Sequence, residues 1–155
     1  MTSDERAKLI DLYAEGYDAV VAALAGIDDE GMEAREAPGE WSVRQIIHHL
    51  GDSEMAAAFN LRLMLAQENP LLQGYDHEAF ARDLHLGLPV DGSMAAFRGA
   101  RAATLPLLRS LSDADWRRTG ARADGQSHDV ETWLSWYGGH GHDHAEQIRR
   151  SRAAR

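Results

Sequence analysis

Residues 41–50, WSVRQIIHHL, carry the strongest helix-start signal in the chain. Ser42 and Gln45 have the spacing of a capping box, and Trp41 can pack on Ile46 across the cap. Beyond them, apolar residues recur every three or four positions as far as Asn69, which precedes a proline and so disfavours helical geometry. The pattern predicts an amphipathic helix of about 27 residues, about 40 Å long.

Three further segments have the apolar periodicity of helices. The first extends from about Asp4 to Ala25 and stops at Gly26, another extends from residue 93 to 111, and the last begins at Asp129, a typical N-cap residue. The last segment continues its apolar stripe to residue 148. The sequence therefore predicts four long helices.

Residues 70–92, between the second and third helices, have weak periodicity and predict only one short helix, around residues 77–84. Neighbouring helices of an up-and-down bundle are joined by a few residues, so a connection of this length predicts a crossover. A crossover along the bundle leaves the second and third helices parallel. The expected fold is all-α, a four-helix bundle with a long crossover, formed by residues 1–155 as a single domain.

Composition restricts the chemistry. The chain has 155 residues, eight histidines and no cysteine, which excludes disulfides, thiolate metal sites and a cysteine nucleophile. Its net charge of −9 repels nucleic acid and anionic lipid headgroups, so neither is an expected partner. A polar N-terminus and the lack of a long apolar run predict a cytoplasmic protein.

His140 and His144 occupy the apolar stripe of the fourth helix. A spacing of four residues places both rings within about 40° on one helix face, whereas His142 points elsewhere. His49 has the same character on the second helix. Together His49, His140 and His144 could bind a divalent ion and leave open positions, which is typical of a catalytic site.

Imidazole ligands suit zinc or nickel, with ferrous iron as an alternative. Metal-bound water, or a thiolate from a substrate thiol, would then be the reactive group, and no side chain is assigned a catalytic role. The glycines at positions 138, 139 and 141 cost about 2 to 3 kcal/mol in a helix, which close approach to a neighbouring helix would offset.

Several of the polar residues also have a purely structural interpretation. A histidine on an apolar stripe is commonly a hydrogen-bonded core residue, and His77, His85 and His128 are expected to be solvated. Asp52 either orients His49 or is an exposed carboxylate. Arg101 either anchors an anionic substrate or extends its charged end to solvent.

Two segments carry a resemblance to a known family. Residues 39–54, GEWSVRQIIHHLGDSE, followed far downstream by residues 137–148, YGGHGHDHAEQI, resemble the DinB-like superfamily of metal-binding four-helix bundles. By this resemblance His49 matches the first metal ligand, and His140 and His144 match the downstream pair. The family commonly has Asp and His where this chain has Gly141 and Asp143, which changes the surroundings of the ligands.

The resemblance also implies a function. Members with known activity are mostly S-transferases that use a low-molecular-weight thiol as a cofactor, so the leading expectation is a thiol-dependent S-transferase acting on small electrophiles. A metal-dependent hydrolase and a non-catalytic stress-response or ligand-binding bundle are the alternatives. The expected partners are a small-molecule substrate and a second copy of the chain in a homodimer.

Overall fold

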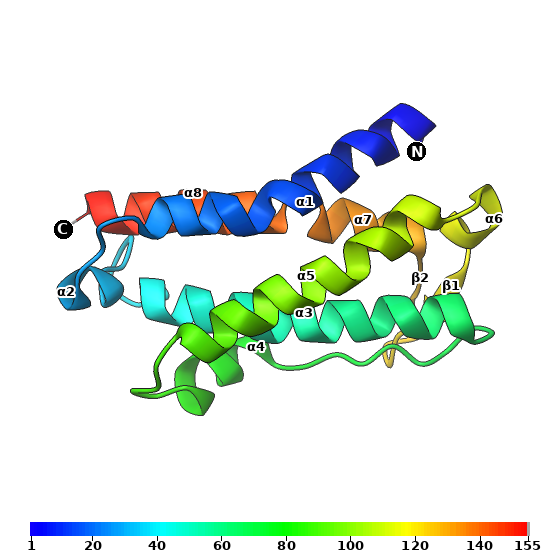
Figure 1. The fold of residues 1–155 in the computed structure, drawn as a ribbon. Coiled ribbons are helices and arrows are strands. Elements are labelled where there is room, and N and C mark those ends of the chain that lie inside the picture. Colours follow the sequence, from blue (N-terminus) through cyan, green and yellow to red (C-terminus); the bar gives the residue numbers. More distant parts are fainter. Residues whose placement is uncertain (155) are drawn as a thin grey trace.

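In the computed structural model, which describes residues 1–154, two pairs of long helices form a four-helix bundle (Figure 1). Helix α1 lies beside α8, and α3 lies beside α5. The helices are α1 (Ser3–Leu24), α2 (Asp29–Met32), α3 (Val43–Ala66), α4 (His77–Ala79), the π-helical segment η1 (Phe80–Leu84), α5 (Asp91–Ser110), α6 (Asp113–Trp116), α7 (Val130–Tyr137) and α8 (His140–Ala153). Two strands, β1 (Thr119–Ala121) and β2 (Ser127–Asp129), complete the elements.

The start of α3 is the predicted one. The Ser42 hydroxyl accepts from the Gln45 backbone N–H at 3.3 Å, and the Ser42 N–H donates to the Gln45 side chain at 2.9 Å. The helix ends at Ala66, three residues before the predicted end at Asn69, because Gln67 is already extended. Asn69 has a positive φ of 41°, a left-handed conformation that asparagine tolerates.

The predicted crossover is confirmed. Residues 67–90 run back along α3 from its C-terminal end to its N-terminal end. Helix α5 therefore starts beside the start of α3, and the two helices are parallel (Figure 1). The first part of this connection is extended and bonds to β1, with the Leu72 N–H donating to the Ala121 carbonyl at 2.7 Å. A few backbone hydrogen bonds therefore hold the crossover to a segment almost 50 residues later in the chain.

The hairpin of β1 and β2 was not predicted. Thr119 pairs with Asp129 and Ala121 with Ser127 in antiparallel register, across a turn that contains Gly125 with φ 83°. Each strand has three residues, which is too short for an alternating pattern to be visible in the sequence. The hairpin nevertheless matters, because it brings residues 122–129 over the side of α3.

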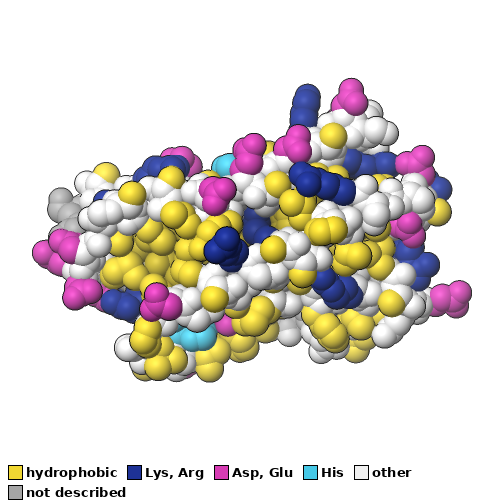
Figure 2. All heavy atoms as spheres, viewed as in Figure 1, with side chains coloured by type: hydrophobic (Ala, Val, Ile, Leu, Met, Phe, Trp, Pro, Cys, Tyr) yellow, Lys and Arg dark blue, Asp and Glu magenta, His cyan; other side chains and the backbone are white. Residues whose placement is uncertain are grey.

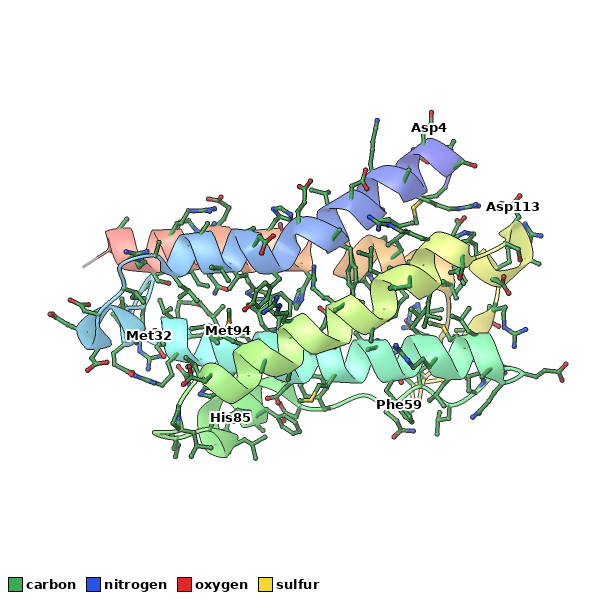
Figure 3. All side chains as sticks on the ribbon, in the orientation of Figure 1. Asp4, Met32, Phe59, His85, Met94 and Asp113 are labelled. Atoms are coloured by element: carbon green, nitrogen blue, oxygen red, sulfur yellow. The ribbon has the colours of Figure 1, made fainter. Side chains whose placement is uncertain are left out.

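Apolar side chains fill the space between the α1/α8 layer and the α3/α5 layer (Figure 2). One cluster, at the α6/α7 end, includes Tyr13, Leu61 and Trp133, and the other, at the α2 end, includes Ile46 and Phe97. Met94 points from α5 into the second cluster (Figure 3). Within residues 1–154, no helix has both the length and the apolar character needed to cross a membrane.

The predicted fourth helix is divided into α7 and α8 at Gly138 and Gly139. The expectation that its glycines permit close helix packing is met at two of them. A Cβ on Gly141 would lie 2.9 Å from the Cα and carbonyl oxygen of Gly16 on α1, and a Cβ on Gly138 would lie 3.1 Å from the Leu9 side chain. Helices α1 and α8 are therefore in backbone contact at the Gly16–Gly141 crossing.

Replacing Gly141 with alanine should destabilise the protein, although alanine favours helix by about 1 kcal/mol over glycine. The new methyl group meets backbone atoms that cannot move aside, and such overpacking costs about 1–3 kcal/mol. The matched control is Gly99→Ala on the exposed face of α5, where a Cβ meets nothing within 4 Å. Thermal unfolding should show a lower Tm for Gly141→Ala and an unchanged or higher Tm for Gly99→Ala; a raised Tm in both would contradict the crossing.

Candidate metal centre

The structure brings together the three histidines selected from the sequence. His49 projects from α3, His140 is the first residue of α8, and His144 follows one turn later. The Nε2 atom of His140 lies 3.4 Å from that of His49 and 3.1 Å from that of His144. One ring nitrogen from each side chain lies within 4.8 Å of those of the other two, a spacing that permits a shared ion.

The geometry of the fourth helix separates His140 and His144, the candidate ligands, from His142, as expected. The ring of His142 turns toward α1, where its Nε2 lies 3.2 Å from the Leu12 carbonyl oxygen. His140 and His144 instead face α3 across the bundle, and their rings lie 4.6 Å apart. The division of the fourth helix leaves the spacing of the histidine pair intact, because both residues belong to α8.

Burial keeps the three imidazoles neutral. Loss of solvent and the proximity of His144 lower the pKa of His49 to about 3. The same two causes hold the pKa of His140 well below its ordinary range, and burial lowers that of His144. Neutral imidazole is the form that binds a metal, so the site is in its binding form at neutral pH.

The ring nitrogens that face away from the cluster differ in their partners. Nδ1 of His144 donates to the Gln147 side-chain oxygen at 2.7 Å, which fixes the tautomer whose Nε2 lone pair faces the cluster. Among the described residues, Nδ1 of His49 and Nδ1 of His140 are buried without a hydrogen-bond partner. Three converging neutral nitrogens fit a divalent ion, since each can supply a lone pair to it.

Asp52 neither orients His49 nor stands free in solvent, because it contacts His85. The Asp52 carboxylate lies 2.7 Å from Nε2 of His85. The His85 ring stacks on His48 with centroids 4.3 Å apart, and Nδ1 of His48 lies 2.8 Å from the Ser93 hydroxyl. His85 is therefore not simply solvated: it lies at the end of the crossover below the start of α5 (Figure 3), where this stack fastens the crossover to α3.

Arg101 has neither of its two expected roles, anchoring a substrate or reaching solvent. It is 4% exposed, and its Nε donates to the Glu54 carboxylate at 2.9 Å. The rest of its guanidinium donates to the backbone carbonyls of Tyr13 and Tyr137, at 2.6 and 3.3 Å. Because Tyr137 ends α7, this buried ion pair supports the junction that leads into His140.

A cavity of about 740 Å³ opens beside the three histidines, which form part of its wall. Along α3 the wall follows one helix face, from His49 through Ser53 and Asn60 to Met64. The fifteen helical steps from His49 to Met64, at 1.5 Å each, give this face a length of about 22 Å. The cavity is therefore elongated, with the histidines near one end and the apolar side chains of Met64 and Leu72 toward the other.

Aromatic and loop residues complete the cavity. Trp133, Trp136 and Tyr137 of α7 line it, together with Arg122 and Asp124 from the hairpin. Trp41 contacts the His49 ring at 4.8 Å between centroids and donates from its indole N–H to Glu78 at 3.0 Å.

Two histidines expected to be solvated are in this wall as well. His77, from the crossover, lies 6.1 Å from the His49 ring, and His128, from the hairpin, contacts Trp136 at 4.6 Å. His77 keeps the expected exposure, with 56% of its side chain exposed, and it begins the short helix predicted for the crossover, but no local pattern indicated its place beside the site. His128 is only partly exposed and belongs to the hairpin, which was not predicted. Their places depend on long-range folding of the crossover and the hairpin.

Several known proteins are similar to this chain in sequence. Residues 12–148 match the DinB superfamily. A protein of Oceanobacillus iheyensis named "Putative metal-dependent hydrolase" is 32% identical over 122 residues, covering 79% of this chain and 71% of that protein. A protein of Geobacillus thermodenitrificans with the same name is 29% identical over 136 residues, covering 84% and 75%.

The fold is also found in a solved structure. YfiT from Bacillus subtilis, described as a "probable metal-dependent hydrolase with an unusual four-helix bundle topology", has a TM-score of 0.90 and 26% identity to this chain. The match covers 97% of this chain and 87% of YfiT. Since the family match extends over most of the sequence, the chain belongs to the DinB superfamily.

Proposed function

We propose that this protein is a divalent-metal-dependent hydrolase that cleaves small, uncharged esters or amides. The observation that carries the proposal is the convergence of three neutral imidazoles on the wall of a large elongated cavity. The names of the relatives are consistent with it, since they describe metal-dependent hydrolases.

His49, His140 and His144 would hold the ion, with zinc or nickel as the first candidates and iron as an alternative. A divalent ion in such a site activates water and polarises a carbonyl oxygen. The chain's own contribution is to keep the imidazoles deprotonated by burial and to orient His144 through Gln147. Trp41, packed on His49, limits the access of bulk water from that side.

The walls of the cavity indicate the substrate class. Tryptophan, methionine and leucine side chains line the part away from His49, His140 and His144, which favours an aromatic or aliphatic body. The hairpin contributes one cation, Arg122, which is paired with Asp124 at 3.7 Å. Together with the net charge of −9, this makes phosphate esters poor candidates and favours uncharged acyl compounds.

The thiol-dependent transfer implied by the family resemblance is a second use for the same site. A chain without cysteine cannot trap a thiol cofactor as a mixed disulfide, which is compatible with such a reaction. The names of the relatives give it no support, because they describe hydrolases. Whether turnover requires a thiol separates the two reactions.

Metal binding should depend on each of the three histidines. Changes in residues that only orient a ligand already weaken binding by about 10- to 100-fold, so His49→Ala, His140→Ala and His144→Ala should each lose more than about 100-fold in zinc affinity. Competition with a chromophoric chelator measures the affinity, and circular dichroism checks the fold. His142→Ala is the control and should bind zinc as the wild type does. Wild-type zinc affinity in the His144→Ala variant would refute the site.

The metal-free protein should lose stability as the pH falls below about 6.5. The unfolded chain then binds protons at His49, whereas the folded chain, in which the pKa of His49 is about 3, does not. Between pH 6.5 and 5 this difference amounts to about 2 kcal/mol for His49 alone. Urea unfolding in the presence of a chelator should therefore show a smaller acid-induced loss for His49→Gln than for the wild type; equal losses would show that His49 is not buried as a neutral group.

Hydrolysis itself can be tested with 4-nitrophenyl esters of increasing acyl length. The zinc-loaded protein should cleave the butyrate and hexanoate faster than the acetate, because the longer acyl chains reach the apolar part of the cavity. His144→Ala should abolish this activity and His142→Ala should retain it. If turnover instead occurs only with 2-mercaptoethanol and 1-chloro-2,4-dinitrobenzene, thiol transfer replaces hydrolysis; turnover of neither leaves no support for an enzyme.

A further inference from the structure

Three hydroxyl groups meet in the wall of the cavity beside the histidines. They belong to Ser53 on α3, Tyr75 in the crossover and Tyr137 at the end of α7. The Ser53 side chain lies close enough to both phenols to lower the pKa of each. Three segments that are far apart in the sequence thus place one hydroxyl each at a single point.

This point adjoins the candidate metal centre because of helix geometry. Ser53 follows His49 by four residues on α3, which places both side chains on the same face. Tyr137 precedes His140 by three residues, and their rings lie 5.7 Å apart. Tyr75 is farther along the crossover, where its ring lies 6.5 Å from that of His77. Tyr137 is therefore the phenol next to the ligands.

One O–H proton of these three hydroxyls is available to donate to a ligand. Three hydroxyls carry three O–H protons, and hydrogen bonds between Ser53 and the two phenols can use at most two of them. If Tyr75 donates to Ser53 and Ser53 donates to Tyr137, the Tyr137 proton is left to donate into the cavity. Burial raises the pKa of both phenols, to about 12 for Tyr75, so both stay protonated at neutral pH.

The charges around Tyr137 are compatible with a bound oxyanion. Glu54 lies behind it, but Arg101 pairs with this carboxylate at 2.9 Å and compensates its charge. Arg122 of the hairpin is the cation that faces Tyr137 from the cavity side. Asp124 lies 3.7 Å from Arg122 and offsets part of its charge, so the field at Tyr137 is only weakly positive.

We propose that Tyr137, oriented by Ser53 and Tyr75, is the hydrogen-bond donor that binds the carbonyl oxygen of an acyl substrate and the oxyanion that forms from it. This inference rests on the proposed hydrolase function. In the reaction, water adds to the acyl carbon and the carbonyl electron pair moves onto the oxygen that Tyr137 contacts. The bond to the leaving group then breaks, and the protons of water end on the released alcohol or amine and on the acid product.

Phenylphosphonate is a suitable probe, because it carries oxyanions on a tetrahedral centre next to an aromatic ring. Calorimetric titration of the zinc-loaded protein should give binding that Tyr137→Phe weakens by about 10-fold or more, the usual cost of a hydrogen bond to a charged group. Tyr75→Phe and Ser53→Ala should have smaller effects, because they only orient the donor. Tyr17→Phe makes the same chemical change on α1, outside the cavity, and should bind as the wild type does.

The outcomes separate this inference from the function on which it rests. Unchanged phenylphosphonate affinity in Tyr137→Phe, a larger loss in Tyr75→Phe, or no binding to the zinc-loaded wild type would each overturn the assignment. Zinc affinity, measured separately in every variant, should stay within about twofold of the wild type, since these hydroxyls bind no metal here. If phosphonate binding depends on Tyr137 but no ester is cleaved, the oxyanion site stands and the hydrolase function fails.

Discussion

Backbone contact between α1 and α8 at Gly16 and Gly141 sets the position of the whole candidate site. Gly141 lies directly after His140 and three residues before His144. The distance between the α1 and α8 backbones at Gly141 therefore also fixes the distance from both histidine rings to α3. Helices usually pack 8–10 Å apart because side chains separate them, and glycine on both sides permits a closer approach. A second close approach to α1 lies nearby, where Gly138 faces the Leu9 side chain.

The buried Arg101–Glu54 pair lies next to the same crossing. A Cβ on Gly16 would overlap the Arg101 guanidinium at 2.3 Å, so the glycine leaves room for the charged group as well as for α8. Removing two charges from water costs several kcal/mol per ion, which this pair offsets with the Tyr13 hydroxyl on Glu54 and with backbone carbonyls on Arg101. One of those carbonyls belongs to Tyr137. The buried Arg101–Glu54 pair is therefore joined by a hydrogen bond to Tyr137, a residue of the cavity wall.

The fourth helix was predicted as one helix and is divided into α7 and α8. The sequence was sufficient for the other long helices, the crossover and the histidine cluster, because each has a local signal. The capping box at Ser42 and Gln45 marked α3, and the spacing of His140 and His144 placed both on one face. The partners of Asp52 and Arg101, the hairpin and the tyrosine hydroxyls had no such signal. Each arises where the crossover or the hairpin returns to α3, and contacts between segments far apart in the chain leave no periodic pattern in either segment.

The long crossover also has a consequence for the order of assembly. His49 and His140 are separated by 91 residues, and the wall between them needs the extended segment, the hairpin and α7 in place. During synthesis, α1, α3 and α5 therefore emerge before α8, and the layer that covers the apolar faces of α3 and α5 consists of α1 alone until α8 arrives. A bound ion would not guide the early collapse of such a chain, since two of the three candidate ligands are made last. Metal uptake would then report that the bundle has closed.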